Sequence, residues 1–142
     1  MSRRIHTTSL RTLLVALTLV ASDVRAAGGV VVIGDARLAR LDAPTLERIY
    51  LGRVIEVDGI PVTAVNANSG SAVRARFLQA FVKRDDDSYV GYWNVRRYSG
   101  LGAPPRELSS SAEIINFVKS TPGAIGYIDE ADVPPGVNVL LK

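Results

Sequence analysis

The chain has 142 residues, of which 47% are hydrophobic, with 17 Lys and Arg against 14 Asp and Glu. It contains no cysteine and a single histidine, His6. The lack of cysteine excludes disulfides, thiolate metal sites, cysteine nucleophiles and a lipid-bearing cysteine. Because His6 lies in a segment that we expect to be a leader, the rest of the chain has no imidazole for a serine triad, a general base near neutrality or a zinc site. Most hydrolase chemistries are therefore excluded.

Residues 1–26 have the pattern of a secretory signal peptide. Arginines, the last at Arg11, precede the apolar run 13–21, and small residues lead to Ala26, after which we predict cleavage. The run is too short to span a bilayer, although an uncleaved anchor is an alternative. The pair Arg3-Arg4 suggests twin-arginine export, but the following residues lack the usual apolar and lysine positions, so ordinary secretion is favoured. We expect a product that is soluble in the periplasm or outside the cell.

Residues 27–142 are predicted to form a single domain. Loss of the leader removes four arginines and one aspartate, which leaves 13 basic and 13 acidic side chains. The high isoelectric point of the full chain therefore belongs to the leader. Nucleic-acid binding needs a clustered basic surface, so we predict no nucleic-acid partner. The remaining length suits one domain with one core.

The domain begins with an extended run and a helix. Residues 30–33 are apolar and β-branched, which predicts a strand in the middle of a sheet. Asp42 is placed to cap the helix that follows it. Residues 54–65 then predict two extended segments that turn at Asp58 and Gly59, a pair typical of hairpins.

Two helices are predicted next. The first covers residues 72–82 and leaves Arg74 and Arg76 on faces away from the core. Its residues at helical spacing that we predict to face the core are Val73, Phe77, Ala80 and Phe81. The second opens with the acidic residues 85–87, as the N-cap and helix-dipole rules favour. It carries three aromatic residues, Tyr89, Tyr92 and Trp93.

The last third of the chain completes an alternating pattern. Residues 99–105 are rich in glycine and proline and predict a loop. Ser110 and Glu113 form a capping box for another helix. Two further strands are predicted at residues 124–128 and 137–141. Strands that alternate with helices predict an α/β three-layer sandwich, with a largely parallel mixed sheet flanked by helices.

A candidate anion site lies where the extended run ending near residue 65 meets the helix over residues 72–82. The first N–H groups of a helix have no partner within it, and the peptide dipoles place about half a positive charge there. Small residues with hydroxyl groups, Ser69, Gly70 and Ser71, let an anion approach these N–H groups. The alternative is a plain N-cap with a flexible turn, because serine and asparagine are preferred there for local reasons.

Four segments carry a family resemblance. They are residues 50–53, the stretch 66–71, the aromatic helix at 89–93 and the stretch 122–127. Together they resemble the phosphate-type periplasmic substrate-binding proteins of ABC transporters. The chain looks like one lobe of that two-lobed type II periplasmic-binding-protein fold. The resemblance covers nearly all of residues 27–142.

The resemblance implies a ligand and partners. The ligand is phosphate or a similar small oxyanion, held by the residues Ser69, Gly70 and Ser71, with Asn66, Asn68 and Arg74 as secondary candidates. It implies association with an inner-membrane ABC transporter or another envelope protein, and it leaves a homodimer open. No cofactor and no metal are expected.

The chain departs from the family pattern in two ways, one of which bears on phosphate selectivity and the other on affinity. Phosphate-specific members carry an arginine four residues before the first serine and an acid nearer to it, where this chain has Val65 and Ala67. The arginine would supply a bidentate charge-assisted contact, for which Arg74 could substitute only in part. A single open lobe should also bind weakly: a few hydrogen bonds and one dipole give roughly 4 kcal/mol, a dissociation constant on the order of 1 mM.

Other functions are open alternatives. The lobe could be a periplasmic interaction module that has lost its ligand. An enzyme would have to use carboxylates, a serine, a tyrosine, Lys83 or Lys119, and no nucleophile-elbow or phosphate-loop motif is present, so we predict no enzymatic activity. Residues 85–87 could hold a metal, although helix capping explains them. The three aromatic residues could form a sugar or peptide platform, but their helical spacing favours core packing.

Overall fold

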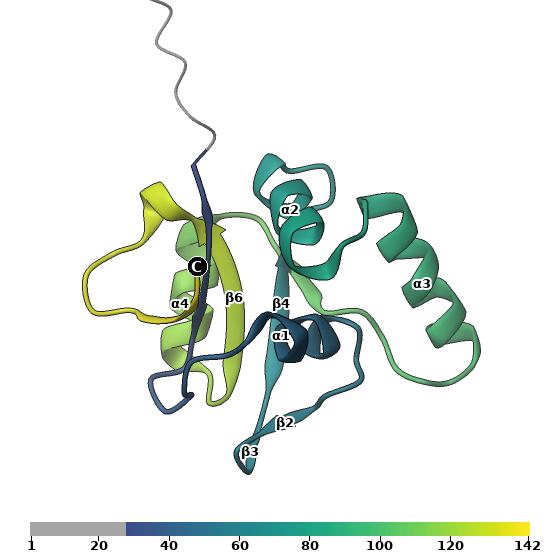
Figure 1. Cartoon of the computed structure of the whole chain (residues 1–142), viewed down its shortest axis with the longest axis horizontal. Coiled ribbons are helices and arrows are strands. Elements are labelled where there is room, and N and C mark those ends of the chain that lie inside the picture. The colour runs from purple at the N-terminus through teal and green to yellow at the C-terminus, as the bar shows by residue number, and fades with distance from the viewer. Residues whose placement is uncertain (1–27) are drawn as a thin grey trace, which may run out of the picture.

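The structure is a computed structural model, and it describes residues 28–142. The predicted signal peptide lies outside the described residues. The described part contains one five-stranded sheet in the order β5-β4-β6-β1-β7 and a separate two-stranded hairpin, β2-β3 (Figure 1). The strands are β1 (Val30–Gly34), β2 (Glu56–Val57), β3 (Ile60–Pro61), β4 (Thr63–Ala67), β5 (Arg106–Leu108), β6 (Ala124–Asp129) and β7 (Asn138–Leu141).

Four α-helices and two shorter helical segments surround the sheet. They are α1 (Ala43–Tyr50), α2 (Ala72–Phe77), the π-helix η1 (Leu78–Val82), α3 (Asp86–Tyr98), α4 (Ser111–Ser120) and the 3-10 helix η2 (Glu130–Asp132). In residues 28–142 no helix has the length and apolar character needed to cross a membrane.

The predicted α/β class with a flanked mixed sheet is confirmed. Strand β4 runs parallel to β5 and β6, whereas β1 runs antiparallel to β6 and β7. Half of the neighbouring strand pairs are therefore antiparallel. The reason is that the first strand inserts between the last two, in the opposite direction, while the crossover through α4 keeps β6 parallel to β4.

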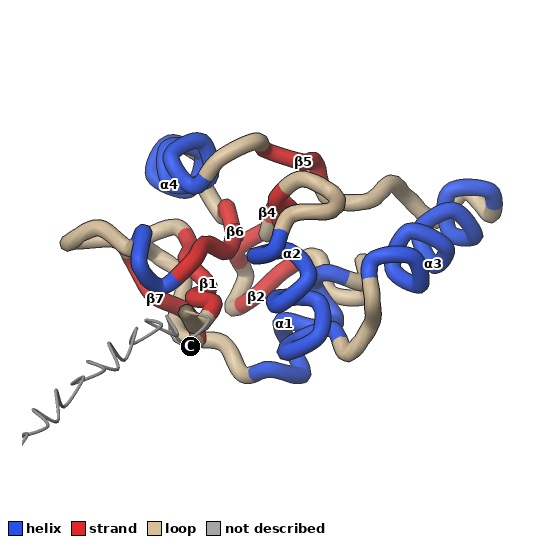
Figure 2. The backbone as a smooth tube through the Cα atoms, turned by 90° about the horizontal axis from the view of Figure 1, so that it is seen from above, coloured by secondary structure: helices blue, strands red, loops and turns tan. Residues whose placement is uncertain are grey.

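Helices cover both faces of the sheet, with α4 on one side and α1 and α2 on the other (Figure 2). Neighbouring residues of β6 point to opposite faces. A Cβ atom on Gly126 would lie 2.6 Å from the side chain of Ile114 on α4. The ring of Tyr127 instead stacks on Phe77 of α2, with 3.7 Å between ring centroids. The core therefore has two halves, one on each side of β6.

Local sequence rules account for most element boundaries. All five residues of β1 are buried, as its apolar run predicts. Asp42 caps α1 by accepting the Thr45 N–H at 2.7 Å, and Asp85 caps α3 in the same way. Asp58 and Gly59 both have positive φ angles, 51° and 77°, as a type I′ hairpin turn requires.

Three elements differ from the sequence predictions. The helix over residues 72–82 changes from α to π geometry at Leu78. Ala80, which was predicted to face the core, is exposed, because the π-helix buries Leu78 and Val82 instead. The second arm of the hairpin divides into β3 and β4, because the Val62 N–H bonds within the hairpin whereas the Thr63 N–H bonds to the Gly123 carbonyl. The short edge strand β5 was not predicted, since three residues are too few to show an alternating pattern.

The turn before β6 should tolerate no side chain at Gly123. This residue has φ of 71°, and an added Cβ would lie 1.9 Å from the Pro61 carbonyl oxygen. Gly136 has a similar φ of 79° with no atom within 4 Å of such a Cβ, and serves as the control. We expect Gly136→Ala to cost about 1–2 kcal/mol from backbone strain alone. Gly123→Ala should cost clearly more in urea unfolding, and equal losses would contradict this.

Candidate functional site

The turn from β4 into α2 contains the predicted anion-binding residues. Ser71 is the N-cap of α2, and its hydroxyl accepts the Arg74 N–H at 3.4 Å. The Ser71 N–H itself donates to the carbonyl of Asn68 at 3.1 Å. Gly70 is exposed and has φ of 79°. Ser71 therefore acts as the helix cap that local preference predicts, with both its hydroxyl and its amide engaged.

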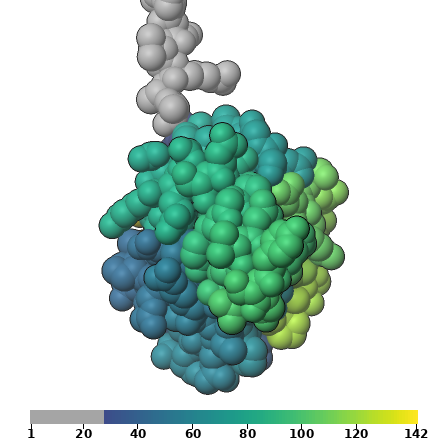
Figure 3. All heavy atoms as spheres, turned by 90° about the vertical axis from the view of Figure 1, so that its right-hand side faces the viewer, coloured from purple at the N-terminus to yellow at the C-terminus, as the bar shows by residue number. Residues whose placement is uncertain are grey.

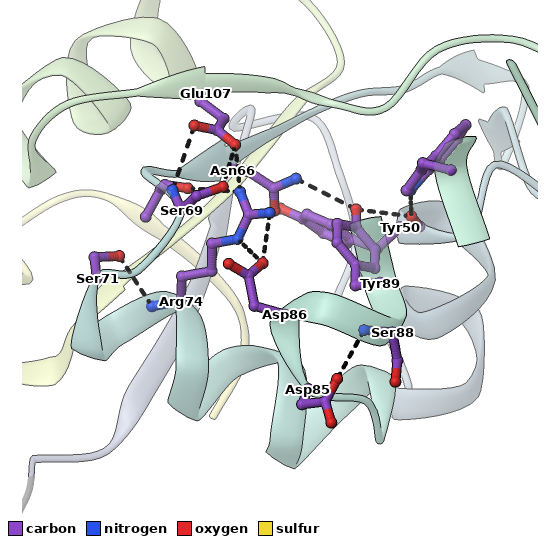
Figure 4. Close-up of polar contacts among 12 residues, drawn as sticks. Tyr50, Asn66, Ser69, Ser71, Arg74, Asp85, Asp86, Ser88, Tyr89 and Glu107 are labelled. Carbon is purple, nitrogen blue, oxygen red and sulfur yellow. Dashed lines mark hydrogen bonds and ion pairs between the residues drawn. The ribbon is translucent and has the colours of Figure 1, made fainter. Parts of the chain in front are cut away.

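Arg74 contradicts its predicted position on an outer face, because it is only 2% exposed. Its guanidinium turns back over the end of β4 and donates to the Ala67 carbonyl at 3.1 Å (Figure 4). It also pairs with Asp86 at 2.7 Å and with Glu107 at 2.8 Å. A side chain on a helix points toward the N-terminus of that helix, so an arginine in the first turn reaches the strand that precedes it. Helical periodicity could not show that α3 and β5 would cover it.

Glu107 is the acceptor on which the polar groups of this turn converge. Its carboxylate accepts the hydroxyl of Ser69 at 2.8 Å, the N–H of Ser69 at 3.3 Å and one N–H of Arg74 at 2.8 Å. Desolvation by itself would raise the pKa of Glu107, but the Ser69 hydrogen bonds and the Arg74 charge outweigh it and lower that pKa. Ser69 and Arg74 thus converge on one carboxylate.

Glu107 was not among the residues predicted from the sequence. It lies on β5, the strand that the sequence pattern does not reveal, and pairs in register with Asn66 on β4. Because paired residues of neighbouring strands point to the same face, this register turns Glu107 toward Arg74. Arg74 and Glu107 lie 33 positions apart in the sequence, so no local pattern predicts their contact.

Asn66 lies beneath the turn in a buried polar network and is 1% exposed. Its amide nitrogen donates to the hydroxyl of Tyr89 at 3.3 Å, and its amide oxygen accepts from the hydroxyl of Tyr127 at 3.1 Å. Tyr89 and Trp93 both donate to the Tyr50 carbonyl, at 3.0 and 3.2 Å. The predicted core role of Tyr89 and Trp93 is therefore confirmed, and Asn66 holds β4 against them.

A cavity of about 260 Å³ opens beside Ser69 and Arg74. Its lining includes two further polar residues, Asn66 and Glu107, and the apolar residues Val90, Trp93, Pro104 and Pro105. A larger groove of about 680 Å³ lies between the start of β1 and η1, and its walls include Ala75, Ala80 and Phe81. That groove contains none of the predicted site residues, so size alone does not identify the site. The smaller cavity is the one lined by Ser69 and Arg74, whose donors converge on Glu107.

The acidic run at the start of α3 has structural partners. Asp85 caps the helix through the Ser88 N–H, and Asp86 pairs with Arg74. Within residues 28–142 no three His, Cys, Asp or Glu side chains lie close enough together to hold a metal ion. Capping and the ion pair account for Asp85 and Asp86 without a metal.

Comparison with protein-family models finds no match, and no curated protein is similar in sequence. Solved structures do share the fold. An ABC-type phosphate transport receptor from Vibrio cholerae matches 80% of this chain and 45% of its own length, with a TM-score of 0.56 and 15% identity. PstS from Borrelia burgdorferi matches 80% of this chain and 47% of its own length, with a TM-score of 0.58 and 15% identity.

A third structure, from Clostridium perfringens and containing bound phosphate, has a TM-score of 0.61 and 20% identity. It covers 80% of this chain and 44% of its own length. The chain therefore spans less than half the length of these solved structures. Over the part that it covers, the chain shares the fold of these structures.

Removal of the buried guanidinium should destabilise the fold. Arg74→Met leaves Asp86 and Glu107 without their cation and the Ala67 carbonyl without its donor. Both carboxylates are partly exposed, so we expect a loss of about 2–3 kcal/mol, below that of a fully buried pair. Arg76→Met is the matched control, because its pair with Asp129 is about one-third exposed on both sides and should contribute about 0–1 kcal/mol. Urea unfolding of both variants measures the difference, and equal losses would argue against a structural role for Arg74.

The site should also give a pH-dependent contribution to stability. The pKa of Glu107 is lowered in the fold from an ordinary value of 4.5. Its contribution is therefore fully present above about pH 4.5 and is lost as the pH falls through the lowered pKa. We expect the stability difference between wild type and Glu107→Gln to shrink across that range in urea unfolding. Arg74 stays charged throughout, because its pKa is raised from an already high value. A difference that does not change with pH would exclude this role for Glu107.

Proposed function

We propose that the chain is an exported solute-binding domain that binds phosphate or a similar oxyanion weakly. The ligand would lie against Ser69, Gly70 and Ser71, with Arg74 and Asn68 beside it. The observation that carries the proposal is the convergence of the Ser69 hydroxyl, the Ser69 N–H and the Arg74 guanidinium on a single carboxylate. Donors arranged around one anion can serve another with the same charge and the same kind of oxygen atoms.

The electrostatics of the turn support this assignment. Arg74 is buried, and desolvation alone would lower its pKa, but Asp86 outweighs that effect and the pKa is raised. The guanidinium is therefore a permanent cation, and its pairs with Asp86 and Glu107 show that it takes carboxylate partners on two sides. One of the solved structures with this fold, from Clostridium perfringens, contains bound phosphate.

The binding should be weak because few groups at this turn can reach the anion. A serine hydroxyl, one amide and one charged donor supply a few kcal/mol, which corresponds to a dissociation constant on the order of 1 mM. A second wall, from a partner protein or another copy of the chain, would raise the affinity by excluding water from the anion. We propose binding without catalysis, in the periplasm or outside the cell, in association with an ABC-type phosphate transporter.

A second candidate is a protein interaction module that has lost its ligand. One observation favours it: the outer side of α3 and the loop after it expose apolar side chains. Tyr98 is 95% exposed, Val95 68% and Leu101 58%. Figure 3 shows this part of the chain, in green, at the centre of the face that it presents. Exposed apolar residues gathered on one element suit a protein partner.

Thermal unfolding in phosphate tests the leading proposal. The protein, produced without residues 1–26, is titrated with phosphate and with sulfate at matched ionic strength. At about ten times the dissociation constant we expect phosphate to add about 1.4 kcal/mol, or about 5 °C in Tm. The double variant Ser69→Ala, Ser71→Ala should lose this increase.

The control for that experiment is Ser110→Ala, which removes the equivalent cap of α4 and leaves the turn at residues 69–71 intact. It should lower the starting Tm but keep the response to phosphate. Equal increases in both salts and in all variants would mean that excluded salt stabilises the fold without binding. In that case the interaction module becomes the better interpretation.

A further inference from the structure

Glu107 makes contacts with Ser69 and Arg74 that an incoming oxyanion would need. Both carboxylate oxygens are engaged: one accepts from the Ser69 N–H, and the other accepts from the Ser69 hydroxyl and from Arg74. Figure 4 shows Glu107 directly over these two residues, on the side of Arg74 away from Asp86. A free anion and the Glu107 carboxylate would repel each other at this distance, and they cannot both use the same donors.

Arg74 would remain in position if Glu107 moved away. Its Nε donates to Asp86 at 2.7 Å, and one terminal nitrogen donates to the Ala67 carbonyl at 3.1 Å. These two contacts come from α3 and from the end of β4, so neither depends on β5. The guanidinium is therefore oriented before any ligand arrives, and the departure of Glu107 would free one of its N–H groups together with both donors of Ser69.

Glu107 is the partner in this cluster that is best able to move. Its side chain is 43% exposed, whereas that of Asp86 is 29% exposed and that of Arg74 is 3% exposed. It is carried by the three-residue strand β5 at the edge of the sheet. The segment before this strand contains Gly100 and Gly102, both with positive φ. A rotation of this long side chain toward solvent breaks its hydrogen bonds to Ser69 and Arg74.

We propose that Glu107 is a resident anion that determines the affinity of the site, and that an oxyanion binds by displacing it from Ser69 and Arg74. This inference rests on the proposed function and adds to it a residue that controls the affinity for the anion. The energy of the Glu107 contacts is subtracted from that of the ligand, so the site holds its ligand weakly until Glu107 is drawn away. A partner that binds the Glu107 carboxylate or moves β5 would raise the affinity for the anion.

The test compares phosphate binding by wild type, Glu107→Gln and Glu56→Gln. Binding is followed through the amide resonance of Ser69 in two-dimensional NMR at constant ionic strength. Gln keeps the size of the side chain and removes its charge, so we expect Glu107→Gln to bind phosphate about tenfold more tightly than wild type. Glu56 is an exposed residue of the β2-β3 hairpin, and Glu56→Gln removes the same charge elsewhere, so its affinity should equal that of wild type.

Glu107→Asp is a second variant that keeps the charge but shortens the side chain. It should also bind more tightly than wild type, because the shorter carboxylate reaches Ser69 less well, and it provides the test if Glu107→Gln does not fold. Binding in Glu107→Gln alone, with none in wild type, would support the inference most strongly. Equal or weaker binding in both Glu107 variants would overturn it while leaving oxyanion binding intact. No response of Ser69 in any protein would overturn the proposed function as well.

Discussion

The buried guanidinium of Arg74 is the group on which the structure of the candidate site depends. An arginine withdrawn from water needs hydrogen-bond acceptors for its N–H groups, because an unpaired buried charge is strongly unfavourable. Here the acceptors come from three different elements: the end of β4, the first turn of α3 and the edge strand β5. Arg74 therefore fixes how these elements meet, and the candidate site is formed where they meet.

This arrangement also explains why β4 can be apolar where the resembled family carries an arginine. Val65 is 1% exposed and packs in the core. The cation reaches the turn from α2 instead, seven residues after the carbonyl of Ala67 to which it bonds. The carboxylate at the turn comes from Glu107, on a strand that follows α3.

Rigid support for the site comes from the aromatic network under it. Tyr127 accepts the N–H of Ala67 and donates to Asn66, while Tyr50 donates to the Val65 carbonyl. Burial raises the pKa of Tyr50 and of Tyr127, so both remain neutral donors across the physiological range. These bonds satisfy the polar groups at the end of β4, where the chain leaves the sheet. The aromatic network therefore fixes the position of the end of β4, from which the turn at residues 69–71 begins.

The sequence by itself determined the features that depend on neighbouring residues. The apolar run of β1, the caps Asp42, Asp85 and Ser110 and the turn at Asp58-Gly59 all follow from contacts within a few positions of the chain. The alternation of these elements was enough to give the α/β class. The turn at residues 69–71 could be proposed as an anion site for the same reason, since a helix start and its small polar residues are local.

Only the tertiary structure decided what surrounds that turn. The burial of Arg74 depends on α3 and β5, and the contact between Ser69 and Glu107 joins residues 38 positions apart. Hydrophobic periodicity describes one element at a time, so it assigned Arg74 to an outer face and could not reveal a three-residue edge strand. The pairing of charges across elements is set by strand register and by helix placement, which no local pattern contains. For this reason the sequence located the turn and named Arg74 beside it, and the fold supplied the carboxylate and the contacts that orient the guanidinium.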